Sequence, residues 1–134
     1  LIIGLMASLK NKKVYMTARI IFGLMLVIFG LNYFFQFMPA PEFNEAATQF
    51  LGALFNTGYI LLIMVIFMFL AGISLLLNKF VPLAMVLFAP FTVNIVLFHI
   101  FLEFSGWIFA LIILLFNVYF IYVHFDKYKP MLRM

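Results

Sequence analysis

Residues 79–104 read KFVPLAMVLFAPFTVNIVLFHIFLEF, and this stretch decides the fold. Residues 80–102 carry no charge, which is long enough for a helix to cross a hydrocarbon core of about 30 Å. Asn94 and His99 interrupt the apolar run, and polar groups in lipid cost free energy unless a partner satisfies them. The stretch therefore predicts a membrane-spanning helix that packs against other helices or lines a polar cavity.

The composition of the whole chain is that of a membrane protein. Of 134 residues, 69% are hydrophobic and 9% are charged, with a mean hydropathy of +1.28, whereas soluble domains are roughly 25% charged. A chain of this length has room for four spans and their connections, so residues 1–134 are predicted to form a single all-α membrane domain. The absence of cysteine excludes disulfides, thiolate metal sites and iron–sulfur ligation by this chain.

Four long apolar runs predict a bundle of four transmembrane helices. Pro39 ends the first run because proline does not continue a helix easily, and Asn78 and Lys79 form a tight turn between the second and third. Pro82 suits the first turn of the third helix, and Pro90 is expected to kink or loosen its middle. The predicted spans are residues 14–38, 58–77, 80–104 and 106–125.

Two glycines mark one face of the first span. Gly23 and Gly30 lie about two helical turns apart, so both point the same way. Small residues on a shared face allow a neighbouring backbone to approach closely. This face is therefore predicted to contact another helix.

Residues 42–55 predict a short amphipathic helix between the first two spans. Glu42 and Glu45 follow a proline at position 41, and acidic residues stabilise the positive end of a helix dipole. Apolar residues then recur at helical spacing. We expect this helix to lie along the outer membrane interface or to cap the bundle, with a break near residues 56–58 before the next span. The apolar residues are Phe43, Ala47, Phe50 and Leu54.

The charges predict the orientation. Every lysine and arginine falls on one side of the four-span arrangement, where it can also contact lipid headgroups, and Glu42, Glu45 and Glu103 fall on the other side. Positive residues concentrate in the cytoplasm, so both termini are predicted to be cytoplasmic, in a bacterial inner membrane, with residues 1–9 lying on that membrane face. The net charge of +4 is explained by this pattern, and no nucleic-acid partner is predicted. The basic residues are Lys10, Lys12, Lys13, Arg19, Lys79, Lys127, Lys129 and Arg133.

Two amides are predicted at one depth of the membrane. At about 1.5 Å per residue, Asn94 in the third span and Asn117 in the fourth both lie about 15 Å from the outer edge. An interhelical hydrogen bond between Asn94 and Asn117 is therefore expected, either to stabilise helix packing or as part of a ligand site.

Four polar residues are predicted to gather in the outer third of the bundle. His99 and Glu103 lie four residues apart on one helical face, and Asn32 and Gln36 reach the same depth on the first span. These four are candidates to line an outward-opening pocket, in which the imidazole would hydrogen-bond a quinone carbonyl or relay a proton. The alternative is that His99 pairs locally with Glu103 and the others are solvated at the interface. Asn94 lies far around the helix from His99, so it is not expected in the same pocket.

No catalytic constellation is present in the sequence. It contains no nucleophile–base pair, phosphate-binding loop or metal-ligand spacing, so neither an activity of its own nor a metal is predicted. His99 and His124 are expected at opposite ends of the bundle, which argues against haem held by both, and no covalently bound cofactor is predicted. His124 is expected beside Asp126 at a solvated helix end. Arg19 is expected to reach Asp126, Tyr122 or a lipid phosphate.

The pattern as a whole resembles the DoxX family of small four-helix membrane proteins. Members are linked to membrane redox complexes, including a small subunit of a thiosulfate:quinone oxidoreductase. The chain departs from the family at Tyr33, where members often carry a basic residue, and at Met68, where many carry an acid. The residues that carry the resemblance are ARIIFG at 18–23, FGL at 29–31, LAG at 70–72, PLA at 82–84, AP at 89–90, Asn94 and FH at 98–99.

Two functional hypotheses and a bland alternative follow. The resemblance implies an integral membrane accessory subunit of a redox or respiratory complex, in contact with other membrane subunits and facing a quinone. The predicted pocket suggests instead a protein that binds a quinone or lipid without any partner subunit. A purely structural or assembly role requires neither ligand nor pocket.

Overall fold

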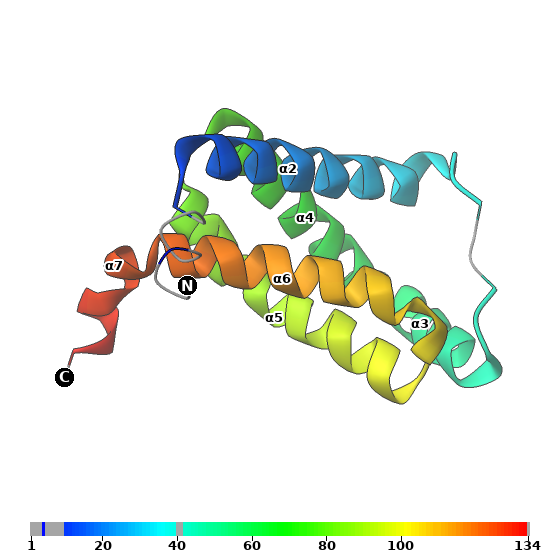
Figure 1. Ribbon diagram of the computed structural model, residues 1–134. Coiled ribbons are helices and arrows are strands. Elements are labelled where there is room, and N and C mark those ends of the chain that lie inside the picture. The colour runs from blue at the N-terminus through cyan, green and yellow to red at the C-terminus, as the bar shows by residue number, and fades with distance from the viewer. Residues whose placement is uncertain (1–3, 5–9, 40–41, 134) are drawn as a thin grey trace.

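Four long apolar helices make up most of the structure, so the chain is an integral membrane protein with an all-α fold (Figure 1). The computed structural model describes Gly4, residues 10–39 and residues 42–133. Each long helix, with the short 3₁₀ turn before the last one included, is long and apolar enough to cross a membrane. These helices are α2 (Lys12–Phe35), α4 (Ile60–Leu77), α5 (Val81–Phe101) and α6 (Trp107–Val123).

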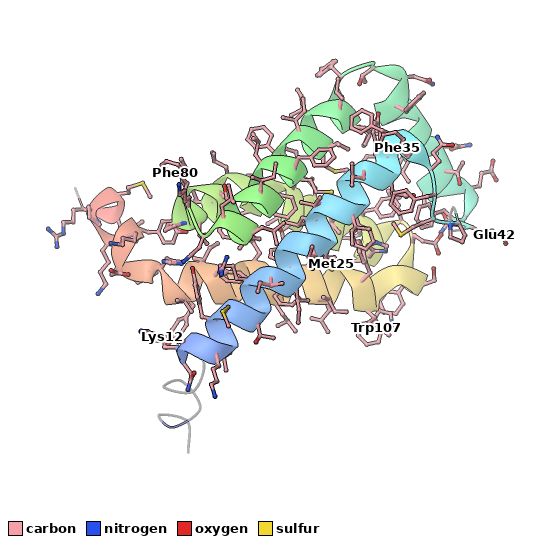
Figure 2. All side chains as sticks on the ribbon, turned by 90° about the horizontal axis from the view of Figure 1, so that it is seen from above. Lys12, Met25, Phe35, Glu42, Phe80 and Trp107 are labelled. Atoms are coloured by element: carbon pink, nitrogen blue, oxygen red, sulfur yellow. The ribbon has the colours of Figure 1, made fainter. Side chains whose placement is uncertain are left out.

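Shorter elements lie at the two ends of the bundle. The basic end is where α2 begins and α4 ends, and Figure 2 shows Lys12 and Phe80 there. The acidic end is where α2 ends and α6 begins, and it carries Phe35, Glu42 and Trp107. The short elements are α3 (Glu45–Asn56) and η1 (Phe104–Gly106) at the acidic end, and α7 (Phe125–Tyr128) and η2 (Lys129–Leu132) at the basic end.

The packing of α2 against α4 depends on three glycines, Gly23 and Gly30 of α2 and Gly72 of α4. A Cβ atom added at Gly72 would lie 2.7 Å from Cγ2 of Val27 and 3.0 Å from the carbonyl oxygen of Gly23. At Gly30, an added Cβ would lie 3.1 Å from the ring of Phe69. The face of α2 that carries Gly23 and Gly30 therefore contacts α4, as the sequence predicts, and the two backbones approach each other at Gly23 and Gly72.

Aromatic rings fill the middle of the bundle. Phe22 of α2, Phe88 of α5 and Phe120 of α6 are all fully buried. The ring of Phe22 stacks on Phe116 with centroids 4.9 Å apart and on Phe120 at 6.2 Å. Large hydrophobic side chains also cover the outside of all four long helices, as expected for a surface in contact with lipid (Figure 2).

The turn between α4 and α5 is tight, as predicted. Asn78 and Phe80 both adopt left-handed backbone conformations, with φ of 54° and 60°. The amide of Lys79 donates to the carbonyl of Ser74, which closes the end of α4. Pro82 lies in the first turn of α5, and the helix continues through Pro90.

The ends of the elements differ from prediction by a few residues. Helix α3 begins at Glu45, and the Asn44 side chain caps it by accepting from the amide of Ala47 at 2.8 Å, so Glu42 lies outside the helix. The helix ends at Asn56, and Gly58 (φ 81°) makes the predicted break before α4. The surface segment expected at residues 1–9 falls, except for Gly4, outside the described residues.

Candidate functional site

A cavity of about 550 Å³ lies toward the acidic end of the bundle. Its wall comes from α2, α3, α4, α5 and α6, and among the described residues that line it three are polar: Asn32, Asn94 and His99. The wall includes six phenylalanines from five parts of the chain: Phe29, Phe43, Phe50, Phe91, Phe98 and Phe109. Aliphatic and methionine side chains complete it: Leu51, Leu54, Ile60, Leu61, Met64, Met68 and Ile95.

Helix α3, together with Phe43 just before it, forms one wall of this cavity. The ring of Phe98 on α5 lies between Phe43, with centroids 5.6 Å apart, and Phe50, at 5.9 Å. The sequence allowed two positions for this helix, along the outer membrane interface or capping the bundle. In the structure it packs on the bundle. The apolar repeat from Phe43 to Leu54 carried the signal for this packing, because an apolar face needs something to bury it.

Asn44 and Glu103 tie α3 to the end of α5. The backbone amide of Asn44 donates to Oε2 of Glu103 at 2.5 Å, and the Asn44 side-chain amide donates to the carbonyl of Leu102. The hydroxyl of Ser105 donates to the other oxygen, Oε1 of Glu103, at 2.7 Å. The hydrogen bond from the Asn44 amide has the largest effect and that from the Ser105 hydroxyl the next, and together they hold the pKa of Glu103 below its usual value. Glu103 thus acts on the position of α3 and does not line the cavity.

His99 is held at the end of α5 by contacts around its ring. Its Nδ1 lies 2.9 Å from the carbonyl oxygen of Glu103, and only 6% of the residue is exposed. The rings of Phe98 and Phe109 pack edge-to-face on it with centroids 5.0 and 6.2 Å away, and a Cβ atom at Gly106 would overlap it. The predicted local pairing of His99 with Glu103 therefore occurs, through the backbone carbonyl and not the carboxylate.

The four residues predicted to share a pocket separate into two pairs. Asn32 and His99 line the cavity, whereas Gln36 and Glu103 do not. Gln36 is the left-handed residue that ends α2 (φ 52°), and it is exposed. The Asn32 side-chain oxygen accepts from the amide of Met38 at 2.8 Å, which holds the chain as it leaves the helix.

The predicted hydrogen bond between Asn94 and Asn117 is wrong. The Asn94 amide donates to the carbonyl of Pro90 on its own helix at 2.9 Å, and Asn94 lines the cavity beside His99. The Asn117 amide is buried between helices and donates to the carbonyl of Met85 on α5 at 3.2 Å. Asn117 contacts α5 at Met85, which lies nine residues before Asn94, or about 13 Å along the helix at about 1.5 Å per residue. The two amides therefore do not lie at one depth.

A second polar cluster at the basic end was not anticipated. Nη1 of Arg19 donates to the carbonyl oxygens of Leu75 (2.5 Å) and Leu76 (2.9 Å), in the last turn of α4. Arg19 was expected to reach Asp126, Tyr122 or lipid phosphate, so this interaction corrects the prediction. A cation at a helix C-terminus also opposes the negative end of the helix dipole, and that rule could have suggested the contact.

Tyr15 links three helix ends in the same cluster. Its hydroxyl lies 2.9 Å from Nε2 of His124 and 3.2 Å from Oδ1 of Asn78. Burial lowers the pKa of His124 despite the opposite effect of nearby Asp126. His124 is therefore half-buried against Tyr15, where a solvated partner of Asp126 was predicted. Within the described part of the chain, no group of three or more histidine, aspartate or glutamate side chains could hold a metal ion.

No family model, curated protein or solved structure matches this chain. The resemblance to the DoxX family therefore stays a prediction from the sequence. What the geometry offers on its own is an aromatic cavity with three polar groups, closed on one side by a helix that a carboxylate holds in place.

Proposed function

We propose that this protein binds a small apolar molecule in the cavity at the acidic end. The observation that supports this most directly is the cavity itself, whose volume falls within the range of about 300–1,000 Å³ seen for ligand pockets. Its wall has the composition of such pockets, largely aromatic and aliphatic with a few polar groups that orient the ligand. A compound with a flat ring and one or two oxygens, such as a quinone or its reduced quinol form, suits this wall, and a lipid is the alternative occupant.

Binding can be tested by filling the cavity. Met64 on α4 lines the cavity, whereas Leu70 on the same helix is 56% exposed on the outside. Lipids and quinones would be extracted from the purified protein and measured by mass spectrometry for the wild type, Met64→Trp and Leu70→Trp. We expect a bound compound in the wild type and Leu70→Trp that is depleted in Met64→Trp. Equal amounts in all three proteins would contradict the proposal.

A role as an accessory subunit of a membrane redox complex is proposed as the second candidate. The sequence resemblance to DoxX supports it, and a quinone in the aromatic cavity would connect the two proposals. The protein would then need a partner that carries the redox chemistry. Purification in a mild detergent and identification of co-purifying proteins tests this directly, and recovery of the chain alone, at full yield, would count against it.

The proposed orientation places the basic end in the cytoplasm of a bacterial cell. Because the chain has no cysteine, single substitutions provide clean reporters. We expect a membrane-impermeant thiol reagent added to intact cells to label Ser105→Cys at the acidic end and not Lys79→Cys at the basic end. The reverse pattern would put the cavity on the cytoplasmic side.

A further inference from the structure

We infer that the cavity selects a ligand that donates hydrogen bonds, such as a phenol or a quinol, over one that only accepts them, such as a quinone. This inference rests on the proposed function, because it concerns which ligand enters the same cavity. It follows from the hydrogen bonds that the three polar lining residues already make. Each of those bonds uses one polar atom and thereby determines which atom is left for a ligand.

The contact of His99 determines where its proton lies. A backbone carbonyl oxygen only accepts hydrogen bonds, so Nδ1 of His99 must carry the proton that it shares with the Glu103 carbonyl at 2.9 Å. In the neutral imidazole the other nitrogen, Nε2, then has a lone pair and no proton. None of the described residues offers Nε2 a partner, and the ring lines the cavity. His99 therefore presents an acceptor, the opposite of the donor that a quinone carbonyl would need.

The two asparagines are oriented by backbone partners in the same way. The Asn94 nitrogen donates to the Pro90 carbonyl, so its oxygen Oδ1 is left as a second acceptor. The Asn32 oxygen accepts from the Met38 amide, so its nitrogen Nδ2 is left as a donor. Neither amide can be turned around without placing two donors or two acceptors against each other.

The cavity therefore offers two acceptors, from His99 and Asn94, and one donor, from Asn32. A hydroxyl on an aromatic ring matches this set, since it donates one hydrogen bond and can also accept one. A quinone carbonyl can use only the Asn32 nitrogen, and it would leave the acceptors of His99 and Asn94 unpaired in an apolar site, which costs free energy.

Two ligands that differ only in the hydroxyl hydrogen test this inference. Binding of 4-octylphenol and of its methyl ether, 4-octylanisole, would be measured to the full-length protein in lipid nanodiscs, with empty nanodiscs subtracted. At pH 8, we expect the phenol to bind about tenfold more tightly, as for one or two added hydrogen bonds.

Three variants assign the preference to particular atoms. Asn94→Leu and His99→Met each remove one acceptor and should bring the ratio of the two affinities toward one. Asn32→Leu removes the donor, which both ligands can use, and should leave the ratio unchanged. Asn94 bonds only within its own helix, so Asn94→Leu keeps the test valid even if His99→Met fails to fold.

The outcomes separate this inference from the proposed function. Saturable binding of both ligands with equal affinity, or tighter binding of the ether or of a decyl-benzoquinone, would overturn the preference for donors and leave a binding cavity in place. Saturable binding of neither ligand to the folded wild type would overturn both. A phenol preference that survives in Asn94→Leu and His99→Met would overturn the assignment to these acceptors.

Discussion

The carboxylate of Glu103 accepts a hydrogen bond from the backbone amide of Asn44 at 2.5 Å, although 59 positions separate the two residues in the sequence. This bond joins the start of α3 to the end of α5, directly beside the cavity that α3 helps to close. Since the donor is a backbone amide, no substitution at Asn44 except proline removes it. The acceptor is the partner that mutation can change.

Glu103→Gln is expected to remove an acid-sensitive part of the stability. Hydrogen bonds from Asn44 and Ser105 hold the pKa of Glu103 below its usual value of 4.5. A carboxylate whose pKa is lowered by folding stabilises the folded state at pH above the usual value, and this stability is lost as the pH falls through the lowered pKa. Thermal unfolding would be measured in detergent from pH 7 to pH 3. The wild type should lose stability below about pH 4.5, and Glu103→Gln should lack this loss. The exposed Glu42→Gln is the matched control and should follow the wild type.

His124 is expected to make the protein acid-sensitive in a higher range of pH. Burial lowers its pKa from the usual 6.5, so protonation favours the unfolded state, and stability should fall as the pH drops below 6.5 toward the lowered pKa. His124→Gln should flatten this part of the profile. Tyr15→Phe keeps the ring that packs on His124 at 5.6 Å and should keep the slope, while lowering stability by about 1 kcal/mol for each of the hydrogen bonds lost to His124 and Asn78. A flat wild-type profile between pH 7 and 5 would contradict this account.

Gly72→Ala is expected to separate α2 from α4. The added methyl group would lie 2.7 Å from Val27 and 3.0 Å from the Gly23 carbonyl, and overpacking of this kind costs about 1–3 kcal/mol. Gly52→Ala in α3 is the control, because a Cβ there meets nothing within 4 Å and alanine favours a helix. Unfolding in mixed micelles with increasing SDS should show a lower free energy of unfolding for Gly72→Ala and not for Gly52→Ala.

Arg19→Leu is expected to weaken the end of α4. It removes the hydrogen bonds to the carbonyls of Leu75 and Leu76, and bonds to a charged donor are worth about 1.5–3 kcal/mol. Lys79→Gln, which removes an exposed charge near the same helix end, is the control. If Arg19→Leu unfolds at the same temperature as the wild type, water or lipid replaces the guanidinium without loss of stability.

The four spans could be predicted because their signal is strong and local. The apolar runs, the turn at Asn78 and the proline at position 82 all appear in the structure. The glycine face of α2 was also readable, since Gly23 and Gly30 recur at helical spacing. Helix ends were less accurate: the proline at position 41 predicted a helix from residue 42, but Asn44 caps α3 by accepting from the Ala47 amide, so the helix begins at Glu45.

Only half of the site could be predicted, because the rest depends on how each helix is rotated about its own axis, and the sequence does not show this. Asn32 and His99 do line one cavity, but so does Asn94, which was expected on another side of α5. A cavity as wide as this one is reached from a broad arc of a helix. Glu103 was assigned to the helix of His99, yet α5 ends at Phe101, and beyond that point the side chain turns to α3.

The bond between Arg19 and the last turn of α4 also has a consequence for biosynthesis. The two partners belong to consecutive spans, so the ribosome has produced both by the time Lys79 emerges. The first helical hairpin can then carry its cation into the bilayer already neutralised by carbonyl dipoles, before the second hairpin exists. We therefore expect a truncated chain ending after α4 to insert stably, with Arg19 as the residue on which that early step depends.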